Sequence, residues 1–161
     1  MAQQEENRYR CKVRATIDSG AAVSVVPNDW FTDYAVKVTA ENGSSYRAAG
    51  GAIIKDEGLR QLNGLMPGDK KAVRKLNVRV AKVRKMLLSV GKIVDAGNQV
   101  VFDKKFSYIK NVQTGTKTEI HRDKGVFVLD FEVLGSELTG GEPGKTLAGL
   151  TRMEDPSGQR P

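Results

Sequence analysis

Short segments in which apolar and polar residues alternate, separated by turn residues, recur along most of this chain. Between Arg10 and Ile17 the apolar residues Cys11, Val13 and Ala15 alternate with charged or polar ones, which is the period-two pattern of a half-buried strand. Many short strands with little helix predict an all-β barrel or sandwich. We predict further strands at 21–26, 36–39, 59–65, 76–81, 99–102, 107–110, 117–121 and 126–133, a hairpin over 46–54, a buried apolar run at 86–90, and one short helix near 90–97.

Composition divides the chain into a lead-in, one domain and a tail. Residues 1–9 are polar and are expected to be a flexible lead-in, and residues 10–134 form the predicted domain. Residues 135–161 are rich in Gly, Pro, Ser and charge, which predicts a disordered tail or linker. Since Cys11 and His121 are the only residues of their types, we expect no internal disulfide, no metal and no cofactor.

The net charge of +7 is moderate and does not by itself establish a nucleic-acid partner. Basic residues gather in the run 70–85, where they alternate with apolar ones. We interpret this run as the solvent face of a strand rather than a phosphate-binding stripe, because no aromatic residues interleave with the charges. The chain has no apolar run long enough to span a bilayer and no signal-peptide pattern, so we expect a cytoplasmic or nuclear protein with no membrane partner.

One motif carries chemistry, the sequence Asp18-Ser19-Gly20-Ala21 at the end of the first predicted strand. Gly20 permits backbone angles that are closed to other residues, and Ser19 can hydrogen-bond nearby backbone. This order therefore predicts a tight turn that presents one carboxylate at its tip. Taken alone, the tripeptide Asp18-Ser19-Gly20 is also common in ordinary turns.

The wider sequence resembles retropepsins, the aspartic proteases in which two identical chains each supply one aspartate. Residues 16–27 resemble their active-site strand, loop and following strand, and residues 46–53 lie where that family has its flap hairpin. Residues 87–103 and 125–130 are similar to segments in the protease region of copia-type retrotransposon polyproteins. The resemblance covers about residues 11–134 and implies a one-lobed acid-protease barrel with extra C-terminal strands.

The resemblance also implies roles for particular residues. Asp18 would be the catalytic residue, paired with Asp18 of a second copy, and a water between the two carboxylates would attack a polypeptide substrate without a metal. The residues expected to support the active-site loop are Ser19, Gly20 and Ala21, and those expected in the flap are Ala49, Gly50 and Gly51. Ser89 stands where many retropepsins have glycine, and copia-type sequences often carry serine there.

Other functions stay open from the sequence. A catalytically inactive module of the same fold, used for dimerisation or partner binding, is favoured by the short flap and by the extra strands beyond Val101. A basic nucleic-acid-binding β-domain using the run 70–85 is the less favoured alternative. A serine hydrolase built on Ser89 is disfavoured because His121 is the only candidate base, and the lack of a second Asp-Ser/Thr-Gly disfavours a dyad within one chain.

Overall fold

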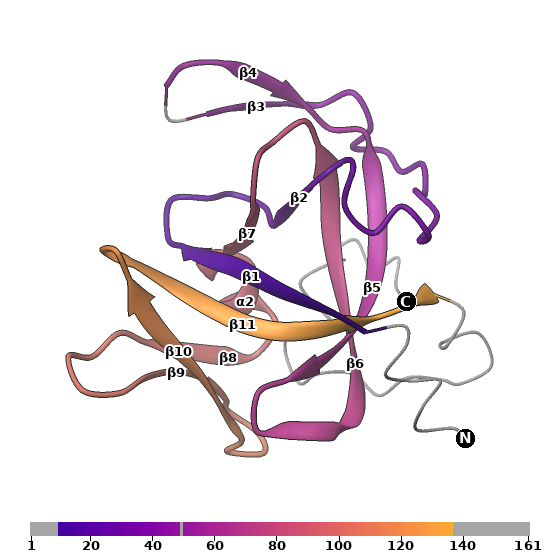
Figure 1. The fold of residues 1–161 in the computed structure, drawn as a ribbon. Helices are drawn as coiled ribbons and strands as arrows, with labels where there is room; N and C mark the ends of the chain where they lie inside the picture. The colour runs from indigo at the N-terminus through magenta and orange to yellow at the C-terminus, as the bar shows by residue number, and fades with distance from the viewer. Residues whose placement is uncertain (1–9, 49, 137–161) are drawn as a thin grey trace.

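The computed structural model describes residues 10–48 and 50–136, and strands dominate them (Figure 1). The strands are β1 (Arg10–Asp18), β2 (Val25–Pro27), β3 (Ser45–Arg47), β4 (Ile53–Lys55), β5 (Gly58–Met66), β6 (Asp69–Ala81), β7 (Met86–Ser89), β8 (Asn98–Val101), β9 (Ser107–Asn111), β10 (Lys117–Asp123) and β11 (Val126–Leu134). The helix in this part of the chain is α2 (Val90–Asp95). These elements confirm the predicted all-β class and the short helix near 90–97.

A closed barrel of six strands forms the body of the molecule. Its strand order is β1-β7-β2-β6-β5-β11, and β11 closes the ring by pairing antiparallel with both β5 and β1. The β1–β11 pairing runs from Arg10 opposite Leu134 to Thr16 opposite Val128. The two ends of the predicted domain are therefore hydrogen-bonded neighbours, which ties residues 10–134 into one unit.

Beyond β11, the strands β10, β9 and β8 continue the same sheet as a three-strand extension. The short β3–β4 hairpin is a separate sheet. In Figure 1 the hairpin lies at one end of the barrel, and the three-strand extension lies on the other side of β11 from it. The extra strands predicted after Val101 therefore do not lie between the hairpin and the loop that follows β1.

The alternating residues of the barrel strands fill its core. Val13, Ala15 and Ile17 of β1 are buried, as are Leu76 and Val78 of β6. Burying one such aliphatic side chain contributes about 1.5–3 kcal/mol. Cys11, which belongs to the same face of β1 by its spacing, is exposed because it lies near the end of the strand.

Two strand predictions are wrong in extent. The stretch 21–26 forms a ladder only at its end, in β2. The stretch 36–39 makes only an isolated bridge, between Lys37 and Leu59. The predictions for 1–9, Ala49 and the end of the tail lie outside the described residues.

Gly58 begins β5 in a conformation that only glycine adopts readily. Its φ is +133°, and a Cβ built there would lie 2.4 Å from Cγ1 of Val36 and 2.8 Å from the carbonyl oxygen of Lys37. We expect Gly58→Ala to lower the free energy of unfolding by about 1–3 kcal/mol for the backbone strain, with the clash adding to it.

Gly115→Ala is the matched control, because Gly115 has a φ of +78° and a Cβ added there would meet no atom within 4 Å. Denaturant unfolding of both variants separates the clash from the strain of the backbone. Equal losses in the two variants would contradict the close approach at Gly58.

Candidate active site

Asp18 is the last residue of β1 and opens the turn that the motif predicts. Its Oδ1 accepts a hydrogen bond from the N–H of Gly20 at 2.8 Å. Asp18 is half-buried, whereas Ser19 and Gly20 are exposed. The carboxylate therefore lies at the surface of this chain, held by the loop, where another molecule can approach it.

Gly20 does not use a backbone conformation reserved for glycine, so that part of the prediction is wrong. Its φ is not among the positive values, and a Cβ there would make an ordinary contact, 3.4 Å from Oδ1 of Asp18. The turn forms because the Gly20 N–H reaches back to the carboxylate, which is a bond that any residue's N–H can donate. Ser19 has no hydroxyl partner within the described chain, and its bracing role stays a prediction.

Ser89 connects the Asp18 loop to the rest of the site. It lies beside Asp18 in the parallel pairing of β1 with β7, and it is fully buried. Its Oγ donates to the carbonyl of Ala21 at 2.8 Å, and its N–H donates to Oγ of Ser24 at 3.0 Å. The same Oγ accepts the N–H of Lys92 at 3.2 Å and so caps α2.

These contacts explain why a serine suits this position. One buried hydroxyl satisfies a loop carbonyl and a helix N–H at once, so the loop after Asp18, β7 and α2 hold one another. One of these contacts also occupies a backbone acceptor in 21–24, because the Ala21 carbonyl accepts the Ser89 hydroxyl, whereas the Ser24 carbonyl still accepts the N–H of Arg79 in β6 at 2.9 Å. Ser89 is a buried hydroxyl bonded to backbone, as expected.

Replacing Ser89 with alanine is expected to lower the free energy of unfolding by about 1–3 kcal/mol. The variant loses the helix cap and leaves the Ala21 carbonyl without its buried donor. Thermal or denaturant unfolding measures the loss, with Ser44→Ala as control because Ser44 is exposed. Equal stability of the two variants would contradict the stabilising role of the Ser89 hydrogen bonds.

The β3–β4 hairpin forms where the flap was predicted. Tyr46 pairs with Ile54, and the turn is closed by hydrogen bonds from the Ala48 N–H to the Ala52 carbonyl and from the Gly51 N–H to the Ala48 carbonyl, both 2.8 Å. Gly51 has a φ of +91°, so glycine is needed there. Gly50 and Gly51 are exposed, and the hairpin lies toward the same end of the barrel as the Asp18 loop (Figure 1). The hairpin is confirmed, and its movement as a lid remains a prediction.

The predictions from the sequence did not include a buried ion pair at the base of this hairpin. The carboxylate of Asp56, which follows β4, is fully buried and accepts two hydrogen bonds from Arg79 of β6, at 2.7 and 2.9 Å. It also accepts the hydroxyl of Tyr46 in β3 and the N–H of Gly58, the latter at 2.8 Å. Arg79 further donates to Oγ1 of Thr39 at 2.7 Å. This hairpin-base network fastens the hairpin to the barrel wall.

The network shifts the proton affinities of its members. Burial alone raises the pKa of Asp56, but the hydrogen bonds from Arg79, Tyr46 and Gly58 outweigh it and hold that pKa below its usual range. Burial, followed by the hydrogen bond to Asp56, raises the pKa of the Tyr46 hydroxyl. At neutral pH, Asp56 is therefore an ionised carboxylate and Tyr46 beside it is a neutral phenol.

Arg79 also corrects the interpretation of the basic run 70–85. Its side chain is only 13% exposed and binds Asp56, so it does not belong to a solvent face. Lys82, Arg84 and Lys85, which follow β6, are exposed as expected.

A surface groove of about 470 Å³ lies away from Asp18, on the outer side of β1 and β11. Lys12, Arg14, Pro67, Asp130 and Glu132 are among the residues that line it. Asp18 is not among the residues that line this groove.

Scans against protein-family models, curated proteins and solved structures found no match. Within residues 10–48 and 50–136, no group of three or more His, Cys, Asp or Glu side chains is arranged to hold a metal ion. The same part of the chain contains no helix that is both long and apolar enough to cross a membrane.

Proposed function

We propose that this chain is a retropepsin-like aspartic endopeptidase that acts as a homodimer, in the processing of a copia-type retrotransposon polyprotein. The observation that carries the proposal is the setting of Asp18. It ends a barrel strand in an exposed turn, and a buried serine on the parallel neighbouring strand holds the loop that follows. A glycine-tipped hairpin toward the same end of the barrel supports it (Figure 1).

One carboxylate of this kind is a weak catalyst, and a two-fold dimer would bring two together. Two carboxylates at such a short distance share one proton, because like charges oppose the second ionisation. The ionised Asp18 then takes a proton from water, and the protonated Asp18 of the second copy donates a hydrogen bond to the scissile carbonyl. Water adds to that carbonyl to give a tetrahedral intermediate, which collapses when the leaving nitrogen is protonated.

The hairpin's part would be to cover the bound peptide. An extended substrate would pair its backbone with β3 or β4, and closure would exclude bulk water from the two carboxylates. The hairpin-base network would limit this movement to the outer part of the hairpin, since Tyr46 and Asp56 fix its base.

The alternative is an inactive module of the same fold that binds partners or dimerises. The observation that favours it is the shortness of the hairpin, whose strands β3 and β4 have three residues each. So short a lid covers little of an extended peptide.

The test is incubation of the full chain with a diverse peptide library at mildly acidic and at neutral pH, with and without pepstatin. Pepstatin-sensitive cleavage is the expected result, together with a dimer in sedimentation. A dimer that cleaves nothing would favour the inactive module, and cleavage insensitive to pepstatin would refute the aspartic mechanism.

A further inference from the structure

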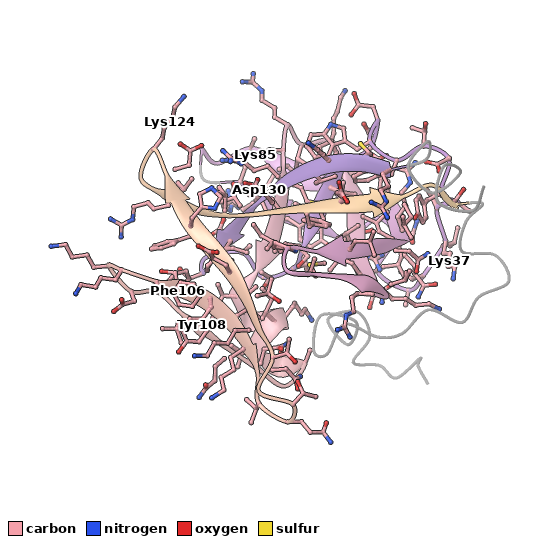
Figure 2. The ribbon with its side chains drawn as sticks, turned by 60° about the horizontal axis from the view of Figure 1, so that its bottom comes forward. Lys37, Lys85, Phe106, Tyr108, Lys124 and Asp130 are labelled. Atoms are coloured by element: carbon pink, nitrogen blue, oxygen red, sulfur yellow. The ribbon has the colours of Figure 1, made fainter. Side chains whose placement is uncertain are left out.

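Aromatic and basic residues gather on the three-strand extension, away from Asp18. In the sequence from Phe102 to Tyr108, aromatic residues flank two lysines, an interleaving that the run 70–85 lacks. We define the aromatic–basic patch as Phe102, Lys104, Lys105, Phe106, Tyr108 and Lys117. Figure 2 shows Phe106 and Tyr108 on this lobe, far from Lys37 on the opposite side of the molecule.

Two rings of the patch are exposed, and the third, Tyr108, is half-buried. Phe102 and Phe106 are 43% and 44% exposed, although Phe102 also contacts the Phe127 ring and the inward residues Ile109 and Ile120 of the extension are buried. The rings of Phe106 and Tyr108 lie 5.4 Å apart between centroids and are inclined by 33°. Two neighbouring rings, tilted relative to each other, form an aromatic platform at the start of β9.

The loop between β8 and β9 holds this platform in place. The carboxylate of Asp103 accepts the N–H groups of Lys105 and Phe106, at 2.9 and 3.3 Å. Ser107 Oγ accepts the N–H of Asp103 at 2.8 Å and donates to its carbonyl at 2.9 Å. The Asp103 carboxylate therefore fixes the backbone that carries Lys105 and Phe106.

The lysines of the patch are available for a ligand. Lys117 lies over the Tyr108 ring, with Nζ 4.5 Å from the centroid, so a base that stacks on this face of Tyr108 must displace the lysine. Lys104, Lys105 and Lys117 form no ion pair with any described residue, although Glu119 and Asp123 share the face of β10 that carries Lys117. Lysines beside exposed aromatic rings complement a nucleic acid, in which phosphates lie beside bases.

We propose that the aromatic–basic patch binds single-stranded nucleic acid, with bases stacking on Phe106 and Tyr108 and phosphates contacting the lysines. Stacking on aromatic side chains combined with basic groups along a strand is how sequence-tolerant single-strand sites work. The rings distinguish this ligand from an acidic peptide, which would use the lysines alone. The proposal is independent of peptidase activity, since no patch residue belongs to the Asp18 loop or the hairpin.

The test is titration of the full chain into fluorescent 15-nucleotide single strands, the matching duplex and a poly-glutamate peptide, at several salt concentrations. We expect the single strands to bind most tightly. Phe106→Leu/Tyr108→Leu, which keeps apolar bulk, should weaken single-strand binding at least about fivefold and leave the salt dependence unchanged.

Lys104→Gln/Lys105→Gln should weaken binding about 10- to 30-fold at 0.1 M salt and lower the slope of log affinity against log salt by about 1.4. Lys37→Gln/Lys55→Gln removes the same charge elsewhere and should change little. Equal binding of duplex or poly-glutamate, unchanged affinity in the leucine variant, or equal losses in the two lysine variants would each overturn the proposal.

Discussion

Replacing Asp18 with asparagine is expected to abolish peptide cleavage and leave the fold intact. The loss should be at least about 100- to 10,000-fold, because the pair loses both the group that takes a proton from water and the group that gives one to the carbonyl. The fold should survive because asparagine keeps the oxygen that accepts the Gly20 N–H at 2.8 Å. Cleavage and the unfolding midpoint are measured on the same preparation.

Asp29→Asn is the matched control. It removes one exposed carboxylate from the loop after β2 and leaves the Asp18 turn unchanged. Full activity is expected for the control, and cleavage that survives Asp18→Asn would remove Asp18 from the mechanism.

A mixing experiment tests whether two chains share the site. After subunit exchange, an equal mixture of native and Asp18→Asn chains should keep about a quarter of the activity of native protein at the same total concentration, because only native homodimers have both carboxylates. A chain that works alone would keep about half. The second result would refute the shared dyad even if Asp18 is essential.

The parts of the fold that depend on local alternation could be predicted from the sequence. In β1 and β6 the side chains that point inward are apolar at every second position, so Val13, Ala15, Leu76 and Val78 mark their strands without knowledge of any partner. The tight turn at Asp18 and the hairpin at Gly51 are also local, since the bonds that form them join residues close together in the chain.

The parts that depend on distant partners could not be predicted. The residues 21–24 have strand-like composition, but the Ala21 carbonyl accepts the hydroxyl of Ser89, more than sixty positions away, instead of a ladder N–H. Arg79 alternates with Val78 and Val80 as a solvent residue would, yet Asp56 approaches it from the loop before β5. The available signal in the sequence was Asp56, an acid just after the predicted hairpin and two residues before Gly58. This signal does not identify the partner of the acid.

Breaking the hairpin-base network is expected to have the largest effect on stability. Asp56→Asn leaves the Arg79 guanidinium, only 13% exposed, with the exposed Glu41 carboxylate at 3.9 Å as its remaining counter-charge, and Arg79→Met leaves the buried carboxylate without its counter-charge and its two guanidinium donors. Each single variant should lose about 3–5 kcal/mol of unfolding free energy, as is typical when one partner of a buried ion pair is removed. The double variant should lose less than the sum of the two, because it leaves no unpaired charge.

Asp130→Asn is the control, because it also removes a carboxylate from an arginine pair. Asp130 and its partner Arg14 have side chains 47% and 48% exposed, so solvent screens them and the loss should be much smaller. If Asp56→Asn and Asp130→Asn lose similar amounts of unfolding free energy, burial of the Asp56–Arg79 ion pair does not strengthen its contribution to stability. Tyr46→Phe, which removes only the hairpin's bond to Asp56, gives a milder test if Asp56→Asn does not fold.

The effect of Asp56 should also depend on pH, and its sign follows from the lowered pKa. A carboxyl whose pKa is lower in the folded than in the unfolded chain binds fewer protons when folded, so its ionisation stabilises the fold above the ordinary aspartate pKa of about 4. That stabilisation is lost as the pH falls below about 4 toward the folded pKa. The stability difference between the native chain and Asp56→Asn should therefore be constant near neutral pH and shrink in acid. A difference that grows as the pH falls would mean that the buried carboxyl is protonated in the folded chain, and that the hairpin base is not held by an ion pair.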